Sequence, residues 1–202
     1  SPATFGVGNQ VADVTGYCLA DGRVRLYAFV QPDGIRSAIS TDATGTKFVA
    51  EPGQRLTGTP GGQTRAYVLA DGRVRLFYTN GGISIVKFRG GFRAYFSNLE
   101  KPGVKAERIT RTATSPDMLT WTVGPVITGS AGTIKQGASH PFAFTDGKRI
   151  ALYYNGDRAG SYGALRSVST DGVKFTDERA VKPGAGDPQL IALPKGVTLL
   201  FY

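Results

Sequence analysis

Cysteine, histidine, methionine and tryptophan are nearly absent from this sequence, since each occurs only once in 202 residues. A single cysteine excludes a disulfide framework within the chain, and one cysteine with one histidine excludes a zinc site built from these two residue types. The sequence also lacks a phosphate-binding Gly-x-x-x-x-Gly-Lys-Ser/Thr motif and an acidic loop that would demand calcium. We therefore expect neither a cofactor nor a metal ion.

Long apolar runs and blocks of like charge are lacking too. No stretch approaches the ~20 apolar residues that cross a membrane as a helix. The net charge is +9, but the basic residues are scattered singly, and no run of five or more like charges occurs. We expect no nucleic-acid partner and no membrane partner, whereas an anionic glycan is compatible with the charge.

Glycine and proline are abundant, with 28 and 11 residues, while only 19% of the residues are charged and 41% are hydrophobic. This composition speaks against a helical bundle and favours many short strands joined by turns. The length suits one domain with a substantial core, and we predict a single all-β domain over residues 1–202.

One octapeptide occurs twice. Residues 19–26 and 69–76 both read Leu-Ala-Asp-Gly-Arg-Val-Arg-Leu, and looser copies lie at 144–154 and 193–202. Asp-Gly between two apolar, alternating runs predicts a β-hairpin, because its tight turn needs residues that tolerate positive φ.

A second repeated element follows the hairpin: a Ser/Thr-x-Asp turn and, a few residues later, an aromatic residue. The turn aspartates are Asp42, Asp117 and Asp171, and the aromatic residues are Phe48, Trp121 and Phe175. The aspartate side chain is expected to accept hydrogen bonds from backbone N–H groups two or three residues on. The aromatic residue then anchors the next strand in the core.

Together the two elements make a unit of four antiparallel strands, which is typical of a β-propeller blade. We predict four to five blades, over about residues 9–56, 62–128, 135–181 and 185–202. The 62–128 region is long, and the stretch 83–96 would split it in two if it forms a further inner hairpin. The segment 3–7 is predicted to add a strand beside 199–202 and close the ring in a monomer. The alternative is a truncated chain with an open edge that favours dimerisation.

The units Leu-Ala-Asp-Gly-Arg-Val-Arg-Leu-Phe-Tyr, Ser-Thr-Asp-Gly-Val-Lys-Phe, Ser-Pro-Asp-Met-Leu-Thr-Trp and Gly-Asp-Pro-Gln resemble blades of the bacterial sialidase-like and arabinanase/fructosidase-like propellers. The likeness covers nearly the whole chain. The resemblance implies glycan substrates and Asp turns that lie away from the active site. The turn motif of sialidases is only approximated, because 40–48 is one residue too long and 169–175 one too short.

Candidate site residues follow from the position eight residues before each hairpin turn. This position holds Asp13, Gln63 and Asp187, and His140 before Pro141 takes the equivalent place in the third unit. The predicted catalytic residues are Asp13, His140 and Asp187, and the predicted substrate-binding residues are Gln63, Arg65 and Tyr154. Each could instead be an ordinary turn or strand residue.

A glycosidase needs a carboxylic acid that protonates the leaving oxygen and a second carboxylate as base or nucleophile. The resemblance implies Asp, Asp and Glu on inner strands. Here the glutamates fall elsewhere: Glu51 and Glu178 on predicted outer strands, Glu100 in a loop, and Glu107 at the start of a third strand.

Two functional hypotheses remain open. One is a secreted, carbohydrate-recognising propeller with a glycan partner, acting as a glycoside hydrolase if it is an enzyme. The other is a non-catalytic protein-interaction or inhibitor propeller that displays loops, with 98–108 as the main contact loop. The chain begins Ser-Pro-Ala without Met, as a secreted protein does after its signal peptide is removed, although an expressed fragment would begin in the same way. We expect an extracellular location.

Overall fold

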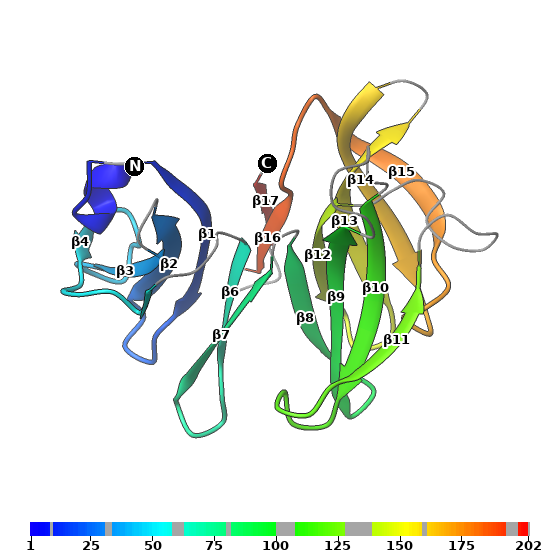
Figure 1. The fold of residues 1–202 in the computed structure, drawn as a ribbon, viewed down its shortest axis with the longest axis horizontal. Coiled ribbons are helices and arrows are strands. Elements are labelled where there is room, and N and C mark those ends of the chain that lie inside the picture. The colour runs from blue at the N-terminus through cyan, green and yellow to red at the C-terminus, as the bar shows by residue number, and fades with distance from the viewer. Residues whose placement is uncertain are drawn as a thin grey trace. The chain divides into compact units, whose positions relative to one another are not determined.

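The computed structural model of the chain describes residues 1–8, 10–30, 34–57, 63–79, 82–99, 108–127, 139–158, 161–192 and 198–201. It consists almost entirely of antiparallel strands (Figure 1). The chain forms two compact units, Ser1–Asn80 and Gly81–Tyr202.

The first unit holds two sheets. The larger sheet has the strand order β1-β2-β3-β4, with the short β5 also paired to β3, and β6 with β7 forms a separate hairpin that packs beside β1 and β2. The strands are β1 (Val11–Cys18), β2 (Val24–Val30), β3 (Gly34–Ser40), β4 (Phe48–Ala50), β5 (Leu56–Thr57), β6 (Gln63–Val68) and β7 (Val74–Thr79).

The second unit holds two four-stranded sheets, in the orders β11-β10-β9-β8 and β12-β13-β14-β15, and the β16-β17 hairpin. Their strands are β8 (Ile83–Phe88), β9 (Gly91–Leu99), β10 (Arg108–Ser115), β11 (Thr122–Val126), β12 (Ser139–Thr145), β13 (Ile150–Arg158), β14 (Ser161–Ser169), β15 (Thr176–Pro183), β16 (Gln189–Ala192) and β17 (Thr198–Phe201).

These sheets confirm the predicted all-β class and its four-stranded antiparallel units. The long region 62–128 contains two separate sheets, the β6-β7 hairpin and the β8–β11 sheet. The number of blades, their boundaries and the single-domain organisation stay predictions.

The twin octapeptides form twin turns. In the first, the Arg23 amide and Nε donate to the Asp21 carboxylate at 3.0 and 2.8 Å. In the second, Arg73 makes the same two bonds to Asp71 at 3.0 and 2.7 Å. The predicted Asp-Gly hairpins are therefore present in both copies, with the same local geometry.

The predicted strand over residues 3–7 is wrong, because Pro2–Phe5 form a 3-10 helix. Proline suits the first position of a helix, and Gly6 ends it in the left-handed conformation at φ 66. Phe5 is only 2% exposed and packs with Ala28, Val30 and Ala38 in the core of the first unit. The aromatic side chain thus packs on the sheet of its own unit.

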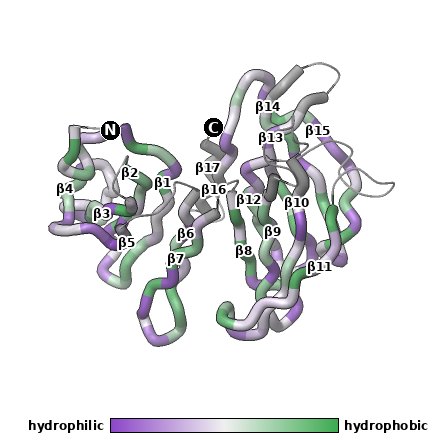
Figure 2. Tube along the Cα trace, viewed as in Figure 1, coloured by the Kyte–Doolittle hydropathy of each residue, from purple (hydrophilic) through white to green (hydrophobic). Residues whose placement is uncertain are grey.

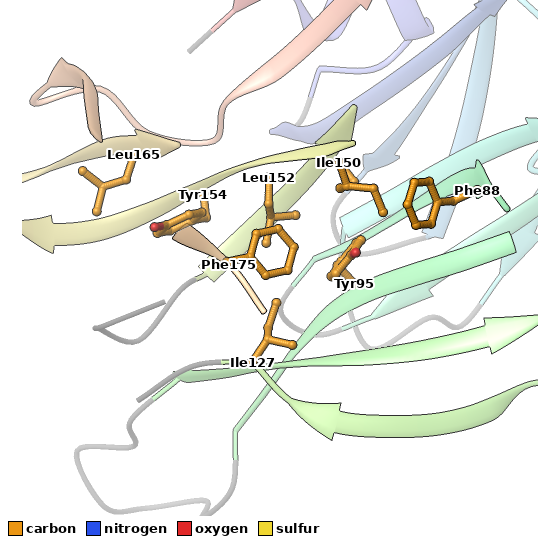
Figure 3. Close-up of a cluster of buried hydrophobic side chains, with 9 residues drawn as sticks. Phe88, Tyr95, Ile127, Ile150, Leu152, Tyr154, Leu165 and Phe175 are labelled. Carbon is orange, nitrogen blue, oxygen red and sulfur yellow. The ribbon is translucent and has the colours of Figure 1, made fainter. Parts of the chain in front are cut away.

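The core of the second unit lies between its two four-stranded sheets. Alternate residues of β13 point into it, namely Ile150, Leu152 and Tyr154, each 0% exposed. Figure 3 shows them grouped with side chains from the β8–β11 sheet. Figure 2 shows hydrophobic and hydrophilic stretches interspersed along the strands.

Candidate functional site

The three Asp turns form as predicted. The carboxylate of Asp171 accepts the amides of Val173 and Lys174, both at 2.8 Å, and Asp117 accepts those of Leu119 and Thr120 at 2.8 and 2.9 Å. In the longer turn, Asp42 accepts the Thr44 amide at 2.9 Å. The predicted role of these aspartates as acceptors for amides two or three residues on is confirmed.

The pKa values of these carboxyls reflect the same bonds. Backbone N–H groups of Thr120 and Leu119 hold the pKa of Asp117 below its ordinary value. Partial burial would raise the pKa of Asp171, but the amides of Lys174 and Val173 outweigh it and lower the pKa as well.

One Asp turn also joins two sheets. Tyr95 of β9 donates its hydroxyl to the carbonyl of Gly172 at 2.9 Å, and Arg89 donates Nη2 to the carbonyl of Thr170 at 2.7 Å. The ring of Tyr95 also meets Phe175 edge-on, with ring centroids 5.7 Å apart. This turn is structural, because its carbonyls and its aromatic residue are used to hold the β8–β11 and β12–β15 sheets together.

The three predicted catalytic residues share an uncommon backbone conformation. Asp13, His140 and Asp187 have φ values of 54°, 52° and 51°. The first two lie where the pairing register shifts, between Ala12 and Thr15 in β1 and between Ser139 and Phe142 in β12. Positive φ in a non-glycine residue is strained by about 1–3 kcal/mol and tends to occur at functional positions. Bulges likewise re-aim side chains near such positions.

The structure brings His140 and Asp187 together in the second unit. Nδ1 of His140 lies 3.2 Å from Oδ1 of Asp187, and the side chains are 23% and 59% exposed. The cluster is therefore open to solvent on the Asp187 side. Asp13 belongs to the first unit and is described apart from them.

Asn155 of β13 holds this pair in place, and sequence reasoning missed it. Its Nδ2 donates to Oδ1 of Asp187 at 2.9 Å, and its Oδ1 accepts the Asp187 amide at 2.8 Å. Asn155 is 3% exposed. A polar residue directly after the apolar run Leu152-Tyr153-Tyr154 was the available signal. We call His140, Asn155 and Asp187 the His140 cluster.

The hydrogen bonds of the cluster depend on whether Nδ1 of His140 carries a proton. Nδ1 lies 3.1 Å from Nδ2 of Asn155 and 3.2 Å from Oγ of Ser139, in addition to its contact with Asp187. Nδ1 accepts from Asn155 when it is unprotonated, and it donates to Asp187 when it carries a proton. The cluster can therefore take up or release a proton while keeping a hydrogen bond, which suits acid–base chemistry and sugar hydroxyl binding alike.

Two of the three predicted substrate-binding residues are buried. Tyr154 lies in the core, where its hydroxyl bonds Oγ of Ser167 at 2.8 Å and Oε2 of Glu178 at 2.7 Å. Arg65 is 5% exposed and donates Nη1 to the Thr64 carbonyl at 3.1 Å. Gln63 is the first residue of β6, paired with Thr79, and its side chain lies outside the described part. These positions give neither Tyr154 nor Arg65 a solvent-facing side chain.

The glutamates of the outer strands are engaged elsewhere. Glu51 bonds Nη2 of Arg25 at 2.8 Å and Oγ of Ser37 at 2.7 Å. Burial would raise the pKa of Glu51, but these bonds outweigh it and lower the pKa, which is the opposite of what a general acid needs. Glu178 bonds Tyr154, and Glu100 and Glu107 lie outside the described residues.

Among the residues that the structure describes, no group of three or more His, Cys, Asp or Glu side chains could hold a metal ion. No helix in the described ranges is long and apolar enough to cross a membrane.

No protein-family model matches the chain, and no curated protein matches its sequence. Solved structures do match. The endo-arabinase from Bacteroides thetaiotaomicron VPI-5482 is 13% identical, with a TM-score of 0.66, over 98% of this chain and 90% of that one. The alpha-L-arabinofuranosidase from Lactobacillus brevis is 12% identical, with a TM-score of 0.63, over 95% and 82%. A family-43 beta-1,3-galactosidase is 12% identical, with a TM-score of 0.56, over 96% and 76%.

These neighbours are propellers of the glycoside hydrolase type, so the chain has a β-propeller fold. At such low identity the likeness defines the fold and leaves the activity to be argued from the site. The arabinanase-like part of the predicted resemblance is supported at the level of the fold, while the sialidase-like part stays a prediction.

Proposed function

We propose that this chain is a secreted, carbohydrate-recognising propeller whose sugar site contains the His140 cluster. The observation that carries the proposal is the shared strained backbone of Asp13, His140 and Asp187, together with the hydrogen bonds that fix the latter two to Asn155. Strain persists where the surrounding structure enforces it, and Asn155 does so from within β13. The names of the fold neighbours, arabinanase, arabinofuranosidase and galactosidase, support the glycan as ligand class.

Glycoside hydrolysis is the catalytic form of this proposal. Within the His140 cluster, Asp187 supplies a carboxylate and His140 supplies a group that can give or take a proton at Nδ1 or Nε2, while Asp13 is the predicted second carboxylate. The required proton donor to the leaving oxygen would then be protonated His140 or one of the two aspartic acids.

The alternative is a non-catalytic protein-interaction or inhibitor propeller that displays loops. The observation that favours it is the engagement of Glu51 and Glu178 in outer-strand contacts with Arg25 and Tyr154. Each of these two carboxylates is thus engaged by side chains of its own unit.

The test compares the natural sequence with Asp13→Asn and Asp187→Asn on a panel of neutral and acidic polysaccharides. Reducing-sugar and sialic-acid release report catalysis, and affinity electrophoresis reports binding. Asp71→Asn is the matched control, because its side chain is 51% exposed and its ion pair with Arg73 closes within one hairpin turn.

Loss of sugar release in Asp13→Asn and Asp187→Asn, with Asp71→Asn unchanged, would establish a glycosidase and its carboxylates. Binding without release, weakened by Asp187→Asn, would establish recognition alone. Absence of both on every polysaccharide, with the protein folded, would refute the glycan proposal and favour a protein partner.

A further inference from the structure

A row of aligned side chains crosses the β12–β15 sheet on the face opposite the core. Tyr153 of β13 pairs with Arg166 of β14, and Arg166 pairs with Arg179 of β15. Residues directly opposite one another in antiparallel strands project to the same face. Leu152 and Tyr154, on either side of Tyr153, point into the core, so the row points away from it. Figure 1 shows β13, β14 and β15 adjacent in this order.

The row places two arginines at directly opposite positions of β14 and β15. Like charges directly opposite each other in a sheet are destabilising. Arg179 is partly compensated, because its Nε bonds Oδ1 of Asp177 at 2.7 Å, but its side chain remains 68% exposed. Arg166 forms no ion pair with the residues that the structure describes. An incoming anion would relieve the repulsion between the two.

The surrounding charge has the same sign. Residues 81–202 hold 16 lysines and arginines against 9 aspartates and glutamates, so +7 of the net charge of +9 falls in this unit. One pair further along the same face, Lys182 of β15 lies opposite Ala164 of β14. We call Tyr153, Arg166, Arg179 and Lys182 the basic row.

The basic row continues into the His140 cluster. Ala164 pairs with Asn155, and Asn155 lies two residues from Tyr153 on the same face of β13. Alternate residues of a strand are about 7 Å apart. Ala164 and Asn155 themselves are 0% and 3% exposed, so a polymer would contact the exposed Asp187 of the cluster and the exposed Arg179 of the row and pass over the buried residues between them.

We propose that the basic row binds the carboxylate or sulfate groups of an acidic polysaccharide whose neighbouring sugar lies at the His140 cluster. This rests on the proposed function and names the class of glycan. A guanidinium presents paired N–H donors that match the two oxygens of a carboxylate or sulfate. Tyr153 adds an aromatic surface and a hydroxyl beside Arg166, a combination suited to the apolar face of a sugar.

The test measures affinity for polygalacturonate, which carries carboxylates, for dextran sulfate, which carries sulfates, and for neutral arabinan. The variant is Arg166→Gln with Arg179→Gln. The control is Arg23→Gln with Arg73→Gln, which removes the same two charges from exposed Asp–Arg pairs in the first unit. We expect the first double variant to bind polygalacturonate or dextran sulfate about tenfold more weakly. The control should change affinity less than about twofold, and neither should alter binding of arabinan.

The proposed role of the basic row and the proposed function are refuted by different results. Equal loss of affinity in both double variants would show that net charge alone attracts the polymer and would refute the role of the basic row. Binding of arabinan without binding of either acidic polymer would refute the role of the basic row and leave the proposed function standing. If the folded natural sequence binds none of the three polymers, both proposals are refuted. Urea unfolding of each variant confirms that the surface substitutions leave the fold intact.

Discussion

Tyr95→Phe should destabilise the second unit by removing one hydrogen bond and nothing else. The side chain is 0% exposed, and its hydroxyl donates to the Gly172 carbonyl at 2.9 Å. The phenylalanine ring would keep the edge-on contact with Phe175. Burial raises the pKa of Tyr95 well above its ordinary value, so the hydroxyl remains a donor across the whole neutral range.

The size of the effect follows from what replaces the bond. An internal hydrogen bond contributes about 0.5–1.5 kcal/mol net, and a buried carbonyl left without a partner adds to the loss. Nη1 of Arg93, 3.5 Å from the same carbonyl, can move closer and recover part of it. We expect a loss of about 1–2 kcal/mol, which corresponds to a fall in Tm of roughly 2–8 °C for a chain of this length.

Trp121 makes the measurement specific, because it is the only tryptophan and lies in the second unit, after the Asp117 turn. Its fluorescence during urea unfolding reports that unit. Tyr153→Phe is the control within the same unit, since this side chain is only partly buried and its hydroxyl makes no hydrogen bond with the described residues, so the change should stay within about 0.5 kcal/mol. If Tyr95→Phe changes the free energy of unfolding no more than Tyr153→Phe does, the Asp turn does not join the two sheets as described.

Two further predictions concern the Asp turns and a strand glycine. The pKa values of Asp117 and Asp171 are lowered, so the stabilisation that these carboxylates give is complete above about pH 4 and is lost as the pH falls through the lowered values. The urea concentration at the unfolding midpoint should therefore be lower at pH 3 than at pH 6, and the difference should be smaller in Asp171→Asn. An unchanged midpoint in the natural sequence would contradict this. Gly34→Ala should destabilise the first unit far more than Gly53→Ala, because both have positive φ but only at Gly34 would a Cβ run into the carbonyl of Leu56; thermal unfolding of both variants checks this order.

The features that the sequence predicted well are those that depend on near neighbours. The bonds between Asp21 and Arg23, and between Asp171 and the amides two and three residues on, close within one turn. Such bonds form wherever the same residues recur. Spacing also singled out Asp13, His140 and Asp187, which share a positive φ, and their grouping in one site stays a prediction.

The features that sequence reasoning missed depend on distant contacts or on competing local signals. Asn155 meets His140 and Asp187 across 15 and 32 residues of sequence, and no local pattern encodes that meeting. At the N-terminus, the apolar residues around Phe5 were interpreted as a strand, whereas Pro2 and Gly6 favour a short helix. The burial of Tyr154 depends on the neighbouring sheet, which a single strand's pattern does not reveal.

The duplicated octapeptide has a consequence for how the chain folds. β2 and β7 begin with the same residues, Val-Arg-Leu, after the same turn, so β1 has two nearly equivalent partners in an unfolded chain. The native loop between β1 and β2 covers residues 19–23, whereas a loop from β1 to β7 would cover 19–73. Chain entropy disfavours the longer closure by roughly 2 kcal/mol. This difference makes the native pairing about thirtyfold more frequent during the search. Lengthening the Asp21-Gly22 turn would reduce that preference and increase the fraction of molecules trapped with exchanged strands.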